Sequence, residues 1–430
     1  MPAGLFLKKK PELSPYKKGD VLVLFGELFS RGYANGLVEE AERRGMTIVR
    51  ATVGRRDAGH LRALTEEEMK DIPKPFINVP IEAGFDLEPD AKGHTPIDQL
   101  KEVKLSEWET CKLDFASLED SRQKAVARFR KNVETFMHEL EKHVPVGANV
   151  LFAHLMAGGV PRTKIVMPLM NRTCKGSGDR YLSSEQFWKS DIGRLCEMNF
   201  REVTAQTLKH LLEISAPLRQ KIEGQGGRVA YTAYGYHGTE IIIRDEYKWQ
   251  TYTPYIQGWA KIELENIAKE AHKKGVHVCV YNCPEILTNS SSIFQGVEVS
   301  LYPLLKAIEK ECGKLPEAQK ALNECRALLK DDLSFDDVQK LTDTYFNMPE
   351  IKEHCVFEKW PQHSSRTQLE IMLKCSEDLK DMHKDQKHLI TFVLSEVVFK
   401  SCGYVMLHDS WKPASPVAWI GHDIVAKSIH

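Results

Sequence analysis

Apolar positions in the first three hundred residues fall into short, nearly continuous runs, each followed by a stretch with helix-like spacing. Continuous apolar runs of five to eight residues are typical of strands buried on both faces. The predicted strands are VLVLFG (21–26), MTIVRATV (46–53), PFINVPI (75–81), ANVLFAHL (148–155), RVAYTAY (228–234) and VHVCVYN (276–282). The predicted helices cover about 35–45, 119–142, 195–222 and 255–274.

Strands that alternate with helices predict a parallel sheet covered on both faces, with right-handed crossovers. We therefore expect a Rossmann-type, doubly wound α/β unit over residues 1–304. Two polar excursions, 82–118 and 160–192, are expected to be insertions into it. After Leu305 the pattern changes to charged helices and an aromatic, proline-bearing tail, which predicts a helical C-terminal extension over 305–430.

Composition narrows the classes of function. The 430 residues carry 59 basic and 60 acidic side chains, so a net charge of −1 gives no overall field for nucleic acid or an anionic membrane. The basic N-terminus is followed by no signal-like apolar region, and no run is expected to reach membrane-spanning length. The ten cysteines are scattered without a CxxC pair, which predicts reduced thiols in a cytoplasmic protein and no metal site.

The first predicted strand leads into a loop with three glycines and then into a helix. Gly26 would let the chain turn off the strand, and Gly32 would let the backbone approach phosphate groups. Gly36 would let the helix and the sheet pack closely. The spacing G-x5-G-x3-G departs from G-x-G-x-x-G, and a strand–turn–helix unit also needs glycine without a ligand, so both interpretations stay open.

The second predicted strand ends at VGRRD (53–57), where a Rossmann fold meets the adenosine ribose. Arg55 and Arg56 stand where an acidic residue would hold an unphosphorylated ribose. Guanidinium groups suit a 2′-phosphate, although a solvated basic turn would look the same. This pair favours NADPH, with NADH as the alternative.

At this point the chain resembles the short-chain dehydrogenase/reductase superfamily, in particular its divergent enoyl reductases. GELFSRGYANG matches their glycine loop in order, with Tyr33 inside it. LMAGG (155–159) resembles the turn after the fourth strand and keeps Ala157 and Gly158, but not the asparagines before them. The helical segment from 196 resembles the interface helix and places Asn199 at the structural and proton-relay position.

The resemblance continues to about residue 300. RVAYTAYGYHG (228–238) is similar to the fifth strand and its loop. VHVCVYNCPEILT (276–288) is similar to the sixth strand and the loop that meets the nicotinamide, with Pro284 and Ile286. Together the segments imply a dinucleotide-binding reductase that forms a homodimer or homotetramer through two of its helices.

Reductases of this superfamily pair a tyrosine with a lysine, which lowers the tyrosine pKa and binds the nicotinamide ribose. GWAK makes Lys261 the candidate lysine. Neither common spacing holds, since Gln257 and Pro254 occupy the expected tyrosine positions. Tyr252, which would precede the helix, is favoured over Tyr255, which lies about 120° around the helix from Lys261.

Tyr236 is a further candidate, because enoyl reductases carry a tyrosine after the fifth strand in a Tyr-x-Gly setting that Tyr236-His237-Gly238 matches. Thr232 could instead supply the hydroxyl that ketone-reducing members of the superfamily supply as serine. For Tyr231, Tyr234 and Tyr236, aromatic packing at the strand end is the alternative to a catalytic role.

The missing serine and Tyr-x3-Lys spacing favour enoyl over ketone reduction. The expected activity is NADPH-dependent reduction of an enoyl thioester carried by acyl-carrier protein or CoA, in fatty-acid or polyketide-type metabolism. A carbonyl reductase and a non-catalytic nucleotide-binding protein remain the alternatives.

Overall fold

The main sheet has eight strands, and every neighbouring pair in it is parallel. A computed structural model describes residues 4–57, 59–251, 256–288 and 296–430 of the chain. Across the sheet the order is β1 (Leu5–Phe6), β12 (Val417–Trp419), β11 (His277–Asn282), β8 (Val229–Tyr234), β7 (Val150–His154), β2 (Val21–Phe25), β3 (Thr47–Thr52) and β6 (Phe76–Pro80). The predicted Rossmann-type α/β class is confirmed, and all six predicted strands belong to this sheet.

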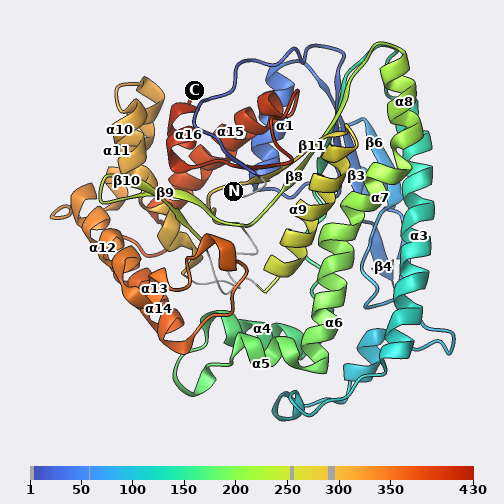
Figure 1. The fold of residues 1–430 in the computed structure, drawn as a ribbon, viewed down its shortest axis with the longest axis horizontal. Coiled ribbons are helices and arrows are strands. Elements are labelled where there is room, and N and C mark those ends of the chain that lie inside the picture. The colour runs from blue at the N-terminus through green and yellow to red at the C-terminus, as the bar shows by residue number, and fades with distance from the viewer. Residues whose placement is uncertain (1–3, 58, 252–255, 289–295) are drawn as a thin grey trace.

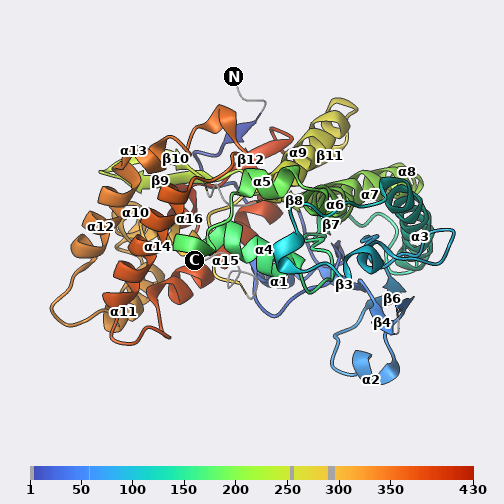
Figure 2. The ribbon, with the colours of Figure 1, turned by 90° about the horizontal axis from the view of Figure 1, so that it is seen from below.

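Helices cover both faces of the sheet, as Figures 1 and 2 show. One face packs against α1 (Tyr33–Arg43) and α15 (Ile390–Asp409). The other face packs against α3 (Phe115–Glu141), α7 (Thr207–Ile214) and α9 (Gly258–Lys273). Successive side chains of each strand point to opposite faces, so the continuous apolar runs feed both cores.

The predicted helix over 195–222 is divided into four parts. It comprises α6 (Asp191–Phe200), a π-helical turn (Arg201–Gln206), α7 and α8 (Ala216–Gly224). A π-helical turn within a helix is uncommon and is frequently found at functional sites.

Residues 305–430 are mostly helical, as predicted, but they also contribute to the sheet. Their helices are α10 (Leu304–Cys312), α11 (Pro316–Leu328), α12 (Phe335–Asn347), α13 (Pro349–Lys352), α14 (Arg366–Asp381), α15 and α16 (His422–Lys427). β12 lies between β1 and β11, and α15 packs along α1. Two parts of this segment therefore complete the main sheet and its helical cover.

α15 also corrects one expectation from the sequence. It is 20 residues long, and an 18-residue window of it has a mean hydropathy of 1.5, so it is long and apolar enough to cross a membrane by those two measures alone. Of that stretch, 72% is buried inside the protein, which is the environment of a core helix.

The two predicted insertions pack against each other. The first holds two short 3₁₀ turns (Pro96–Leu100 and Leu105–Glu107), and the second holds α4 (Val166–Lys175) and α5 (Ser184–Lys189). Phe85, Trp108, Leu169 and Phe187 belong to one small core that these segments share with α6. The two insertions lie together at the lower edge of Figure 1, where α4 and α5 are labelled.

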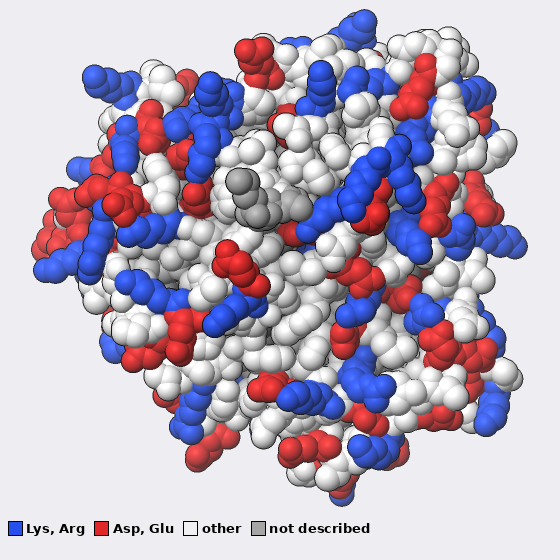
Figure 3. Space-filling view, in the orientation of Figure 1, with Lys and Arg blue, Asp and Glu red and all other residues white. Residues whose placement is uncertain are grey.

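The described chain also contains two hairpins, β4 (Arg55–Asp57) with β5 (His60–Arg62) and β9 (Thr239–Ile243) with β10 (Glu246–Gln250). A short helix, α2 (Glu66–Met69), and three 3₁₀ turns (Gly178–Arg180, Val297–Leu301 and Phe357–Lys359) complete it. On the face shown in Figure 3, basic and acidic side chains are interspersed, in keeping with the net charge of −1.

Candidate active site

The predicted site residues gather where the strand order reverses. From β2 the chain runs through β3 to β6 at one edge, whereas β7, β8 and β11 follow one another in the other direction. In doubly wound sheets, ligands bind outside the carboxyl ends of the strands at this reversal. The loops after β2, β7, β8 and β11 therefore form the candidate active site.

The loop after β2 has the backbone that a pyrophosphate requires. Gly26 has a φ of +130°, and a Cβ there would lie 3.0 Å from the Leu155 Cβ, so the turn requires glycine. Gly32 precedes α1 without a side-chain cap, and a Cβ on it would meet no atom closer than 4.0 Å. Among the described residues, no side chain thus covers the Gly32 position before α1, and the N–H groups and dipole of this helix end suit a phosphate.

Gly36 serves a different contact from the one predicted. A Cβ on Gly36 would overlap the carbonyl oxygen of Phe399 in α15, and one on Gly403 would overlap Gly36 in turn. The expected helix–sheet contact is wrong, because the close approach is between two helices. The sequence could not show this, since α15 lies more than 350 residues further along the chain.

Arg55 is engaged by a carboxylate of the glycine loop. Its two terminal nitrogens donate to Glu27, from Nη1 to Oε2 at 3.0 Å and from Nη2 to Oε1 at 2.9 Å. Thr52 donates a further hydrogen bond to Glu27 Oε2 at 3.2 Å. An acidic side chain therefore does lie at the carboxyl end of β3, and it comes from the glycine loop after β2.

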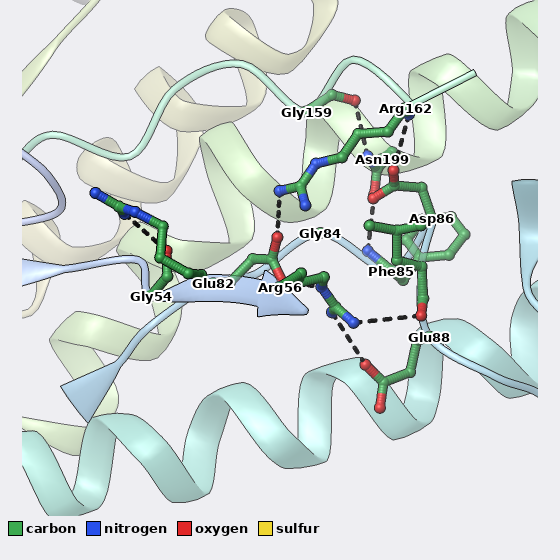
Figure 4. Close-up of polar contacts among 12 residues, drawn as sticks. Gly54, Arg56, Glu82, Gly84, Phe85, Asp86, Glu88, Gly159, Arg162 and Asn199 are labelled. Carbon is green, nitrogen blue, oxygen red and sulfur yellow. Dashed lines mark hydrogen bonds and ion pairs between the residues drawn. The ribbon is translucent and has the colours of Figure 1, made fainter. Parts of the chain in front are cut away.

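Arg56 is also neutralised within the chain, as Figure 4 shows. Its side chain is only 7% exposed and forms ion pairs with Glu82 and, at 3.5 Å, with Glu88. Arg162 bonds to Glu82, and its backbone N–H donates to Asp86 Oδ2 at 2.9 Å. These pairs join the two insertions, so the arginines give no support to the predicted preference for NADPH.

Asn199 in α6 holds two loops of the site together, as Figure 4 also shows. Its Oδ1 accepts from the Phe85 N–H at 2.9 Å, and its Nδ2 donates to the Gly159 carbonyl at 2.8 Å. Gly158, at a φ of +100°, accepts from Thr204 Oγ1 at 3.2 Å, and Ala157 beside it is exposed. These contacts account for the structural part of the role expected for Asn199.

Lys261 reaches the carboxyl end of β8 from α9. Its Nζ donates to the Tyr234 carbonyl oxygen at 2.6 Å, and the residue is 5% exposed. Burial lowers the pKa of Lys261 to about 8, because removal from water disfavours the ammonium ion. Burial, and to a lesser extent the positive charge of Lys261, lower the pKa of His154 to about 3, so the imidazole of His154 is neutral.

The residue whose carbonyl accepts from Lys261 also carries a stacked aromatic ring. Tyr33 stacks on Tyr234 with ring centroids 5.7 Å apart, and its hydroxyl donates to the Pro284 carbonyl. Burial raises the pKa of both phenols well above 10. The loop from Pro284 to Ile286, expected at the nicotinamide, is therefore tied directly to the first residue of α1.

The remaining candidates separate into three groups. Tyr252 and Tyr255 lie outside the described residues. Tyr231 packs into the opposite core and bonds to Ser215, 2.7 Å between the hydroxyl oxygens, so it is structural. Thr232 is buried in β8, and its hydroxyl has no hydrogen-bond partner among the described residues.

Two acidic residues of the site were missed in the sequence. Glu27 follows Gly26 directly, and its position opposite Arg55 was the available signal. Glu285 follows Pro284 and forms a hydrogen bond with Tyr236. Nothing local to Glu285 distinguishes it from a surface glutamate.

Comparison with known proteins decides the family. The family model of enoyl-acyl carrier protein reductase FabMG matches residues 4–429. The chain belongs to the FabMG family of enoyl-acyl carrier protein reductases. No curated protein matches it.

Two solved FabMG structures resemble the whole chain. An apo FabMG, described as a novel type of enoyl-acyl carrier protein reductase, is 47% identical over 100% of this chain and 98% of its own, with a TM-score of 0.96. An NADH-bound FabMG is 41% identical over 100% and 99%, with a TM-score of 0.80. The enoyl-acyl carrier protein reductase (NADH) of Aquifex aeolicus VF5 is a remote match, 13% identical over 67% and 82%, with a TM-score of 0.36.

Membership of this family confirms the resemblance to enoyl reductases that the motifs indicated. The predicted class of oxidoreductase in fatty-acid metabolism is confirmed with it.

Proposed function

We propose that this protein is an NADH-dependent reductase of enoyl thioesters carried by acyl-carrier protein. The observation that carries the proposal is that Lys261, Tyr234 and the Pro284 loop are linked to one another beside the N-terminus of α1. Glu285 of the same loop forms a hydrogen bond with Tyr236. The family and its NADH-bound member support the same substrate and cofactor.

The choice of NADH rests on Glu27. Its carboxylate occupies both terminal nitrogens of Arg55 and presents negative charge where the adenosine ribose lies in Rossmann folds. A 2′-phosphate would meet this carboxylate, whereas a free 2′-hydroxyl can donate to it. Arg56, 7% exposed and paired with two glutamates, offers no compensating charge.

The chain's own groups would act as follows. Bound NADH supplies a hydride to the β-carbon of the enoyl thioester, and negative charge develops on the thioester oxygen. Lys261, held by the Tyr234 carbonyl, places an ammonium charge near this oxygen, where the low-dielectric surroundings strengthen its effect. Tyr236 supplies a phenolic proton, and Tyr252 or Tyr255 remains the predicted second phenol.

We assign the reductase to the short-chain dehydrogenase/reductase type. The support is the order of its motifs along the chain and the position of Lys261 on the helix before β11. Its Tyr–Lys spacing would then be a departure from both common forms.

A steady-state assay tests the function. Purified protein, NADH and crotonyl-acyl carrier protein should give loss of absorbance at 340 nm, with NADPH a much poorer reductant. Turnover confined to a 3-ketoacyl thioester would favour the carbonyl reductase instead. NADH binding without turnover of either thioester would favour a non-catalytic protein.

A further inference from the structure

The loop that carries Glu285 runs beside the loop that carries Tyr236. β8 and β11 are neighbouring parallel strands, with Tyr234 opposite Tyr281 at their carboxyl ends (Figure 1). Beyond that point the Gly235 N–H donates to the Tyr281 carbonyl at 2.8 Å. The backbone contact therefore continues past the sheet into the site.

A second pair of contacts fixes how the two loops align. The His237 N–H donates to Asn282 Oδ1 at 2.7 Å, and Asn282 Nδ2 donates to Glu265 Oε1 at 3.0 Å. A side chain on Gly235 would overlap the Asn282 amide, so the approach requires glycine. Tyr236 lies between these two anchored residues, which limits the directions its ring can take.

Glu285 is anchored on both sides as well. The carbonyl of Pro284 accepts from the Tyr33 hydroxyl, and the Leu287 N–H donates to Ser395 Oγ at 2.9 Å. The Glu285 carboxyl group forms a hydrogen bond with the Tyr236 side chain. Two proton-bearing groups from adjacent loops are thus held in contact, and the loop of Tyr236 follows the strand end at which the Tyr234 carbonyl accepts from Lys261.

The environment of Glu285 keeps its proton on at neutral pH. Burial is the main cause, Tyr236 opposes it through the hydrogen bond, and the charge of Glu298 adds to it. Together they raise the pKa of Glu285 to about 8. Glu285 is therefore mostly a neutral carboxylic acid at pH 7, which can donate a proton as a carboxylate cannot.

Enoyl reduction needs a proton as well as a hydride. After hydride addition at the β-carbon, the substrate is an enolate, and a proton must reach its α-carbon. We propose that Glu285 is the residue that resupplies the proton Tyr236 delivers to the enolate. This role rests on the proposed enoyl reductase function.

The proton transfers balance. The α-carbon–hydrogen bond forms with the electron pair of the enolate as the O–H bond of Tyr236 breaks. The resulting phenolate takes the proton of the Glu285 carboxyl group, and the carboxylate takes one from water. Glu285 acts through Tyr236, so it is a positioning and proton-supplying residue rather than one that touches the substrate.

The test compares Glu285→Gln, Glu285→Ala and Tyr236→Phe with the wild type in the assay with NADH and crotonyl-acyl carrier protein. A glutamine keeps the size of the side chain but carries no acidic proton. We expect E285Q to lower kcat at least tenfold, within the range of about 10² to 10⁴ for lost proton transfer, with KM for NADH changed less than twofold. Formate should restore activity to E285A in proportion to its concentration.

Y236F is the matched control for that rescue. It keeps Glu285 but lacks the phenol through which the proton passes, so formate should not restore it. If formate restores E285A but not Y236F, the loss of activity in E285A is due to the missing carboxyl group and not to a packing defect.

The outcomes separate the two proposals. Wild-type kcat in E285Q, or a loss in E285A that formate does not relieve, would overturn the proton role. A wild-type protein that oxidises no NADH with the enoyl thioester would contradict the enoyl reductase function instead.

Discussion

At the scale of single residues, one carboxylate accounts for the choice of cofactor. Glu27→Gln should free the guanidinium of Arg55 for a 2′-phosphate. A charge-assisted hydrogen bond contributes about 1.5 kcal/mol, which corresponds to roughly a tenfold lower KM for NADPH. Steady-state kinetics with both cofactors would measure the change.

Glu42→Gln is the control for that substitution. Glu42 pairs with Arg50 at 3.7 Å, away from the glycine loop, and should leave the preference for NADH unchanged. The interpretation of Glu27 is wrong if E27Q keeps the wild-type ratio of kcat/KM for the two cofactors.

Two other residues set the response to pH. Lys261 has a pKa lowered to about 8 and Glu285 one raised to about 8, and both are proposed to work in their protonated forms. The rate should therefore be steady near pH 6 to 7 and fall above about pH 8. Because two protons are lost together, the logarithm of kcat should fall by nearly two per pH unit there.

Single replacements should simplify that profile. Lys261→Arg stays charged throughout the range, and E285Q has no proton to lose at this position. In each variant the logarithm of kcat should therefore fall by one per pH unit, from a lower maximum than in the wild type. A wild-type slope of one or less would contradict the joint requirement.

At the scale of elements, two glycines of one loop have opposite consequences. Gly36→Ala places a Cβ against helical backbone of α15, which cannot move aside locally, so it should destabilise the fold by about 3 kcal/mol. Gly32→Ala meets open space in an extended backbone and should change stability by less than about 1 kcal/mol. Urea unfolding would measure both.

For NADH binding the order of the two substitutions should be reversed, with the larger effect in G32A. The Cβ of G32A would stand where the phosphates approach α1, so its dissociation constant for NADH should rise at least tenfold. Fluorescence titration of the folded variants tests this. Undiminished NADH affinity in G32A would place the pyrophosphate elsewhere.

The elements also show what the sequence could predict. Six strands and four helical regions followed from local apolar patterns, since each needs only its own residues. β1 and β12 were missed because they are two and three residues long and pair across almost the whole chain. The partners of Gly36 and Arg56 were missed because sequence shows a side chain but not the group that meets it.

At the scale of the molecule, one buried cluster ties both ends of the chain to α1. His408 in α15 lies 3.1 Å from Glu40 through Nε2, and its Nδ1 accepts from the Ser14 N–H at 3.0 Å. His430 at the C-terminus lies 3.5 Å from Glu40. The N-terminal arm, α1, α15 and the C-terminal segment are thus linked through Glu40 and His408.

The cluster predicts a dependence of stability on pH. Although burial opposes it, hydrogen bonds from His408 and His430 lower the pKa of Glu40 from 4.5 to about 2. A carboxyl group whose pKa is lower in the folded protein stabilises the fold fully at pH values above its unfolded-state pKa. This stabilisation is lost as the pH falls toward the folded-state pKa of about 2. Glu40→Gln should therefore cost about 3 kcal/mol at pH 7 and progressively less below pH 4.5.

Urea unfolding between pH 7 and pH 3 would measure that difference, with Glu39→Gln as an exposed neighbour that should have little effect. An E40Q deficit that is the same at both ends of the range would rule out the carboxylate as its cause.

The central claim is that this chain transfers hydride from NADH to an enoyl thioester. The most direct measurement is mass spectrometry of the product formed from crotonyl-acyl carrier protein and NADH deuterated at both C4 positions. The account predicts a butyryl thioester with one deuterium on its β-carbon, formed by the wild type and lost in Lys261→Ala. A product without deuterium, or no butyryl thioester from folded wild-type protein that binds NADH, would contradict it.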